Sequence, residues 1–218
     1  GIRKLGEYAE SGKPFFASFL TVSNHSPFVV PEAYRCRGEN DEQRIIAYAD
    51  DAIRRFMEAA QQTEWGKNTV FVLVADHGSS RLSPYDMTLS YNHIPVFIYS
   101  DLLQPERIER VTSQIDIWES VLSLLGLEYD NNCTGIDVFS ARRRYAYFVS
   151  NEHLGVSDGT WFWCYGIHSK QEKLYRIGSG ENLLKEYPKK AADMRAYGMN
   201  MMRVNLLIVD EQWTKPCE

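Results

Sequence analysis

The amino-acid sequence predicts an α/β fold, with a largely parallel sheet sandwiched by helices and then a small antiparallel α+β subdomain. Apolar runs of strand length alternate with amphipathic helices, and these runs are apolar on both faces, as in sheets covered on both sides. From about Arg142 the chain changes to short aromatic segments joined by turn residues. We therefore expect an α/β part over residues 1–141 and the subdomain over residues 142–218.

The first elements are a helix, a strand and a long helix. The helix "IRKLGEYAES" is stopped by Pro14, and the run Phe15–Val22 predicts a buried strand because it is apolar on both faces. After a loop, Asn40 caps the long helix, with Gln43 placed for a capping box. Three- and four-residue spacing gives that helix one core face, made of Ile45, Ala49, Ala52, Ile53, Phe56 and Ala60.

Two further strands and a helix complete the α/β pattern. The stretches "NTVFVLVA" and "HIPVFIYS" predict buried strands, separated by a polar loop from Gly78 to Asn92. Ser113 and Asp116 open a capped helix, "QIDIWESVLSLLG", which ends at Gly126. Strands and helices that alternate in this order are typical of a largely parallel sheet.

The tail predicts an antiparallel meander followed by a helix. The strands are expected in "RRRYAYFVSN", "GTWFWCYGIH" and "KLYRI", with a turn at Ser157-Asp158-Gly159. The final helix is expected from about Asn182 to Val209. The run Arg142–Arg144 predicts either a solvated boundary between the two parts or a contact with an anionic lipid surface.

Composition restricts the function classes. The sequence is 44% hydrophobic and 24% charged, with a formal net charge of -5, which argues against a nucleic-acid-binding protein. No apolar run approaches the roughly 20 residues that cross a bilayer. Because the first residue is Gly and a helix begins at once, we expect an excerpt of a longer protein.

The sequence has four cysteines: Cys36, Cys133, Cys164 and Cys217. Their spacing does not fit a metal site, and it permits two disulfides without requiring them. Cys164 is expected in the core.

The candidate metal ligands are Asp76 and His77, at the end of the second apolar run. Ligands of open α/β sheets sit beyond the carboxyl ends of the strands. A carboxylate and a neutral imidazole together suit a divalent cation such as zinc or manganese. Adjacent strand residues point to opposite faces, so both can bind one ion only if the backbone turns, and Gly78 permits a turn. The alternative is an aspartate that caps the loop and a histidine packed beneath it.

Two further histidines are candidates for the same chemistry. His25, in "SNHSP" after the first apolar run, can donate to an anionic oxygen or protonate a leaving group. His93, in "NHIP", precedes the third run and lies at the other end of the strands if that strand runs parallel. The alternatives are a surface histidine for His25 and a packing role for His93.

Five ordered segments resemble the alkaline-phosphatase superfamily. They are "FFASFLTVSNHSPFVVP", "YADDAIRRF", "NTVFVLVADHG", "HIPVFIYS" and "SQIDIWESVLSLLG". Among the sulfatase-like proteins of that superfamily, they are most similar to the lipoteichoic acid synthase-type branch. The resemblance covers about residues 1–140, and it implies that this part is the C-terminal portion of a sulfatase-like catalytic domain.

The resemblance implies a role for each candidate residue. Asp76 and His77 match a metal-ligand pair, and His25 matches the histidine that contacts the transferred group and assists the leaving group. His93 precedes a strand where several branches of the family carry a polar residue, which implies a role at the edge of the substrate or behind the metal ligands. The family's nucleophile comes from an upstream segment, so the fragment alone is expected to be inactive. The implied cofactor is one divalent metal ion: manganese, zinc or magnesium.

The resemblance also implies substrates and a location. The expected reaction is transfer of a phosphoglycerol-type head group from a lipid, through a covalent intermediate, by a protein anchored in the membrane with its catalytic domain outside the cytoplasm. Its partners are an anionic lipid head group, or a sulfate or phosphate ester, and the upstream part of the same chain. The alternatives are a sulfatase and a degenerate module that only binds. The loop "GSSRLSPYDMTLSYN" lacks the lysine that many sulfatases carry there, which favours phospho-transfer.

Overall fold

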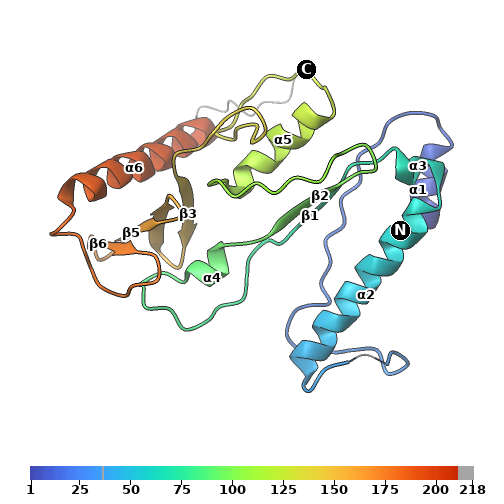
Figure 1. Cartoon of the computed structure of the whole chain (residues 1–218), viewed down its shortest axis with the longest axis horizontal. Helices are drawn as coiled ribbons and strands as arrows, with labels where there is room; N and C mark the ends of the chain where they lie inside the picture. Colours follow the sequence, from blue (N-terminus) through green and yellow to red (C-terminus); the bar gives the residue numbers. More distant parts are fainter. Residues whose placement is uncertain (36, 211–218) are drawn as a thin grey trace. The chain divides into compact units, whose positions relative to one another are not determined.

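The computed structural model describes residues 1–35 and 37–210 (Figure 1). Cys36 and Cys217, and with them any disulfide that either residue forms, lie outside the described residues. The elements in chain order are α1 (Ile2–Ala9), α2 (Asp41–Gln61), α3 (Glu64–Lys67), β1 (Phe71–Val74), α4 (Leu89–Asn92), β2 (Val96–Tyr99), η1 (Gln114–Asp116), α5 (Ile117–Leu124), β3 (Ala146–Ser150), β4 (His153–Ser157), β5 (Trp161–Gly166), β6 (Glu172–Arg176) and α6 (Pro188–Asp210).

The chain forms two compact units. The first comprises Gly1–Leu73 and Val96–Pro105, and the second comprises Val74–Pro95 and the chain from Glu106 onward. β1 pairs with β2, and the parallel direction expected for this sheet stays a prediction. The division at Arg142 is not tested by this packing and also stays a prediction.

In the first unit, α2 begins where the sequence predicts. The side chain of Asn40 accepts a hydrogen bond from the Gln43 amide at 2.9 Å. The Gln43 side chain reaches one residue further back than predicted and accepts from the Glu39 amide at 2.8 Å. Both bonds satisfy amides that have no partner within the helix.

The core face of α2 is narrower than its sequence pattern predicts. Ile45 and Ala60 are fully buried, whereas Ile53 is 43% exposed. Phe56 packs edge-on against Phe71 of β1, with ring centroids 6.3 Å apart. The periodic pattern predicts which side of a helix is apolar, but its burial depends on the elements that cover it.

The strand expected over Phe15–Val22 is wrong for the structure as described. The segment is irregular, and the side chains of Phe16, Leu20 and Val22 are more than two-thirds exposed. A strand needs a neighbour for its backbone hydrogen bonds, and in the described chain β1 and β2 pair only with each other. Phe19 instead packs against Phe56 of α2, with centroids 5.9 Å apart.

In the second unit, the predicted antiparallel meander is confirmed and has one more strand than expected. Its order is β3-β4-β5-β6, with antiparallel neighbours. The added strand is β4, which carries Gly155 at its centre. A side chain there would collide with the ring of Phe148 on β3, so the glycine fills a packing requirement.

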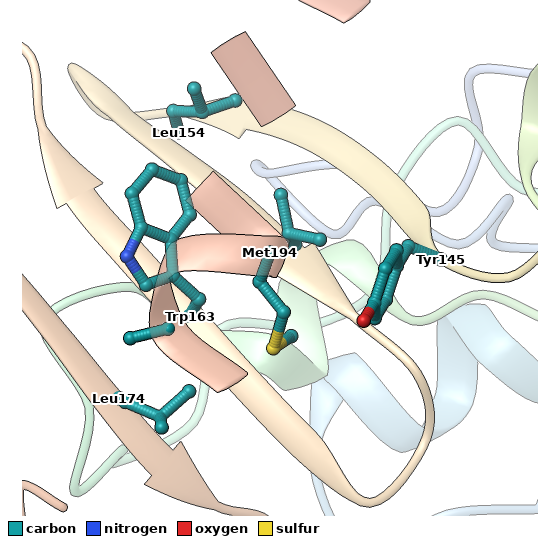
Figure 2. Packing of buried hydrophobic residues seen from close by; sticks show 7 residues of the cluster. Tyr145, Leu154, Trp163, Leu174 and Met194 are labelled. Carbon is teal, nitrogen blue, oxygen red and sulfur yellow. The ribbon is translucent and has the colours of Figure 1, made fainter. Parts of the chain in front are cut away.

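Successive residues of β5 point to opposite faces of this sheet, and each face has a core. Trp163 packs on one face, where α6 covers the sheet; Figure 2 shows Met194 of that helix among the sheet residues. This core consists of Tyr145, Leu154, Val156, Trp163, Leu174, Ala191 and Met194. The other face carries the aromatic cluster, defined as Met87, Phe162, Cys164 and Tyr175. Cys164 is buried as predicted, and burial raises its pKa to about 12.

The arginine run is not a uniformly solvated boundary, which corrects the prediction. The side chain of Arg143 is only 5% exposed and forms an ion pair with Asp116, itself 1% exposed. Arg143 also donates to the hydroxyl of Tyr197 at 2.9 Å and to the carbonyl of Thr134 at 2.8 Å. A buried guanidinium is tolerated when it is paired and hydrogen-bonded in this way. Arg142 and Arg144 are exposed.

Candidate functional site

The backbone turns immediately after β1, at the residues that the sequence singles out. The Gly78 amide donates to the carbonyl of Tyr91 at 2.8 Å. A side chain at Gly78 would collide with the carbonyl oxygen of Ser90. The turn that Gly78 was expected to permit is present, and glycine is needed there because another backbone segment approaches closely.

The turn brings the side chains of Asp76 and His77 to one place. Oδ1 of Asp76 accepts from the His77 amide at 2.9 Å, and the Asp76 side chain is 80% exposed. Nδ1 of His77 lies 2.9 Å from the carbonyl oxygen of Gly78. When Nδ1 carries the proton and donates to that carbonyl, Nε2 keeps its lone pair for another partner. Oδ2 of Asp76 and Nε2 of His77 are 3.9 Å apart.

These two atoms fit part of a metal site. An imidazole that donates from one nitrogen to a backbone carbonyl and offers the other to a metal is the usual arrangement of a histidine ligand. A carboxylate oxygen beside it supplies the harder donor that divalent cations accept. Across residues 1–35 and 37–210, no group of three or more His, Cys, Asp or Glu side chains is placed to hold an ion. The pair accounts for two ligands, and a four-coordinate site requires others.

Tyr91 is a residue of this site that the sequence did not reveal. Its ring stacks on the His77 ring, with centroids 4.4 Å apart and planes 14° from parallel. It lies in α4, a four-residue helix within the segment predicted as a loop. The stacking depends on that helix returning to the turn, and no local pattern around Tyr91 would have indicated it.

The other two candidates occupy different positions. His25 lies in an exposed loop of the first unit, and its Nδ1 is 2.8 Å from the carbonyl oxygen of Ser26. His93 lies in the second unit at the C-cap of α4, and its amide donates to the carbonyl of Leu89 at 2.8 Å. The His93 side chain is exposed. The structure brings Asp76 and His77 together, while the roles assigned to His25 and His93 stay predictions.

A separate hollow of about 280 Å³ contains a cysteine. It is lined by Trp118, Glu119, Tyr129, Asp130, Asn131, Asn132 and Cys133. The Cys133 thiol donates to Oε1 of Glu119 at 2.6 Å. Burial, and then the hydrogen bond to Glu119, raises the pKa of this thiol above its ordinary value. Because the thiolate is the nucleophilic form, a raised pKa disfavours this cysteine as a nucleophile.

Comparison with known proteins gives a family match. The family model described as "Sulfatase" matches residues 2–127, more than half of the chain. Lipoteichoic acid synthase-like YvgJ of Bacillus subtilis is 25% identical over 175 residues, which are 65% of this chain and 28% of that protein. Lipoteichoic acid synthase 2 of the same organism is 22% identical over 156 residues, 61% of this chain and 24% of that protein. The chain thus spans about a quarter of the length of these relatives.

A solved structure gives the fold. A protein in the alkaline phosphatase superfamily from Vibrio parahaemolyticus matches with a TM-score of 0.73 and 21% sequence identity. The match covers 96% of this chain and 54% of that one. At this identity it shows the α/β fold of that superfamily. Together with the family model and the Bacillus relatives, it confirms the resemblance inferred from the sequence.

Proposed function

Because the chain belongs to the sulfatase family, we propose that it is the C-terminal part of a metal-dependent phospho-transferase or hydrolase. The complete protein would carry the nucleophile and the remaining metal ligands on an upstream part of the same chain. The fragment alone would be inactive, because a metal held by two side chains lacks the ligands of a competent site.

The observation that carries the proposal is the pair of adjacent donor atoms on Asp76 and His77. Oδ1 and Nδ1 have local backbone partners, while Oδ2 and Nε2 lie 3.9 Å apart on side chains that are 80% and 44% exposed. An aspartate that merely capped the loop would not require an imidazole oriented in this way beside it. The arrangement supports metal ligation over the capping alternative.

In the proposed mechanism, Asp76 and His77 hold a manganese, zinc or magnesium ion. When bound, the ion supplies Lewis-acid polarisation of phosphoryl oxygens and of the nucleophile. The upstream hydroxyl would lose its proton to solvent and attack phosphorus, which would form the covalent intermediate as the bond from phosphorus to the leaving alcohol breaks. His25 donates the proton that this alcohol oxygen takes up, and His93 contacts the head group at the edge of the site.

The proposed donor is a lipid that carries a phosphoglycerol-type head group. The two Bacillus relatives are named as lipoteichoic acid synthases or synthase-like, which supports this donor. Such a substrate would place the catalytic domain outside the cytoplasm, with an anchor in the cell membrane. Among the helices of the described chain, none has both the length and the apolar character to cross a bilayer.

Sulfate ester hydrolysis is the second candidate. The description of the matching family model favours it. The loop that follows Asp76 and His77 has no lysine and carries Arg81 as its basic residue. This departure from the pattern of many sulfatases favours the phosphate ester.

A module that only binds is less well supported. Such a module would bind through the aromatic side chains of the tail, but Phe162, Trp163 and Tyr175 are buried in the two cores of the sheet. A binding surface needs exposed side chains, so these aromatics serve the fold.

The test uses the complete protein to which this chain belongs, called the parent protein from here on. Its metal content is measured together with its turnover of a phosphodiester and of a sulfate ester. We expect one bound metal ion, with phosphodiester turnover reduced at least 100-fold in both Asp76→Asn and His25→Ala. Metal should be lost only in the aspartate variant, because His25 acts on the leaving group. Asp50→Asn, on the exposed side of α2, is the matched control and should leave both metal content and turnover unchanged.

The outcomes separate the candidates. Turnover of only the sulfate ester would replace phospho-transfer by the sulfatase alternative. Absence of metal from the unaltered parent protein, or full activity in Asp76→Asn, would contradict the proposed site.

A further inference from the structure

The orientation of the His77 ring depends on α4. Tyr91 of this helix contacts the turn twice. Its carbonyl accepts a hydrogen bond from the Gly78 amide, and its ring covers one face of the His77 imidazole. The Arg81 amide adds a longer bond, 3.3 Å, to the Ser90 hydroxyl. Backbone and side chain of the same short helix therefore hold both the turn and the ring.

α4 is in turn attached to the antiparallel sheet. Met87, just before the helix, is 2% exposed and belongs to the aromatic cluster with Phe162, Cys164 and Tyr175. Leu89, the first residue of α4, packs against the same cluster. Core packing is rigid compared with an exposed loop, so this anchor gives α4 a fixed position against the sheet.

We propose that Tyr91 is a positioning residue for His77, and that the aromatic cluster of the sheet supports it. This inference rests on the proposed function, because it concerns the imidazole as a metal ligand. Tyr91 would act through His77 and would not contact the ion or the substrate.

The physical reason is the freedom of an exposed imidazole. Rotation about the Cβ–Cγ bond of histidine is soft, and the His77 side chain is 44% exposed. The hydrogen bond from Nδ1 to the Gly78 carbonyl would by itself compete with water. A ring stacked 4.4 Å away excludes rotations that tilt the imidazole, so Nε2 stays on the side of Asp76. Pre-orienting a ligand raises metal affinity because less conformational freedom is lost on binding.

The experiment measures the affinity of the parent protein for Mn²⁺, by electron paramagnetic resonance of the free ion. It compares the unaltered protein with its variants Tyr91→Leu, Tyr91→Met and Tyr91→Phe. Outer groups that orient a ligand typically contribute 10- to 100-fold to metal affinity, so we expect about tenfold weaker binding in the Leu and Met variants. Tyr91→Phe keeps the stacked ring and should bind like the unaltered protein.

Thermal unfolding of each metal-free variant separates positioning from folding. Tyr8→Leu, which removes a half-exposed ring from α1, is the control and should leave Mn²⁺ affinity unchanged. Unchanged affinity in both Leu and Met variants would overturn the inference while leaving the proposed function intact. Equal loss in Phe and Leu would also overturn it, because the hydroxyl rather than the stacked ring would then matter. If the unaltered parent protein bound none of Mn²⁺, Zn²⁺ and Mg²⁺, the proposed function and this inference would both be contradicted.

Discussion

Gly78 is the residue at which the turn after β1 leaves no room for a side chain. Its Cα faces the carbonyl of Ser90, and its amide is bonded to the next carbonyl along, that of Tyr91. The hydrogen that glycine carries in place of a side chain lets α4 come close enough to stack Tyr91 on His77. The geometry of the candidate metal ligands therefore depends on Gly78, a residue that has no side chain to bind a metal or a substrate.

We expect Gly78→Ala to separate the turn from α4. The added methyl group collides with the Ser90 carbonyl, and overpacking of this kind typically costs about 1–3 kcal/mol of folding free energy. Mn²⁺ affinity of the parent protein should fall by at least about tenfold as the histidine ligand moves. Chemical denaturation and metal titration are the two measurements.

Gly6→Ala is the matched control for this substitution. In α1 the added methyl group would lie 4.0 Å from Nε1 of Trp65, an ordinary van der Waals contact, so the change should leave metal affinity unaltered and slightly stabilise the helix. A Gly78→Ala protein with unaltered affinity would show that the close approach of α4 does not matter for the site.

At the scale of elements, the turn between β4 and β5 is organised by one carboxylate. Oδ1 of Asp158 accepts hydrogen bonds from the amides of Thr160 and Trp161 at 2.9 and 2.7 Å, and Oδ2 accepts from Nζ of Lys190 at 2.5 Å. Burial alone would raise the pKa of Asp158, but these bonds outweigh it and hold the pKa below its ordinary value. The turn predicted from Ser157-Asp158-Gly159 is confirmed, and α6 is tied to it through Lys190.

The lowered pKa predicts how stability depends on pH. Because the folded protein binds the proton more weakly, Asp158 stabilises it above the unfolded pKa, about 4, and this contribution is lost as pH falls through the lower folded pKa. Asp158→Asn should therefore be less stable by about 1 kcal/mol at neutral pH. The deficit should shrink in acid, as measured by urea denaturation from neutral pH to about pH 3.

Glu181→Gln, at an exposed carboxylate, serves as the comparison and should show no such trend. A deficit in Asp158→Asn that stayed constant across the whole pH range would contradict the assignment of the turn to the ionised carboxylate.

At the scale of the molecule, Arg143 joins segments of the second unit that are distant in sequence. It pairs with Asp116 at the start of α5, donates to the Thr134 carbonyl and reaches the Tyr197 hydroxyl on α6. Asp116 also accepts from the Ser113 amide at 2.8 Å, so the same carboxylate caps η1. One buried ion pair thus fixes two helices and a loop together.

We expect Arg143→Met to destabilise the protein by about 3–5 kcal/mol, because it leaves the buried Asp116 carboxylate without its counter-charge. Urea denaturation gives the free energy of unfolding. Arg142→Met, at the exposed neighbouring position, should change it by less than about 0.5 kcal/mol. Equal effects at both positions would show that the ion pair contributes little.

Local signals in the sequence determined most of the elements. The caps at Asn40 and Ser113, the apolar runs of β1 and β2, and the aromatic strands of the tail all appear where the sequence predicts them. The Asp76–His77 pair was also identified from sequence, because a carboxylate and an imidazole at the end of an apolar run are a chemical signal within a few residues. Such signals are local, since caps, periodicity and turn residues act over one or two turns of chain.

Tertiary structure alone decided which surfaces are covered and which side chains meet. It gave Phe15–Val22 an irregular backbone in place of the expected strand, buried Arg143 within a run that was expected to be solvated, and stacked Tyr91 on His77. Each of these outcomes depends on residues that are distant in sequence or on a backbone carbonyl whose position no residue type encodes. The sequence by itself therefore determined the chemistry of the candidate metal ligands, while packing between α4 and the turn decided their orientation.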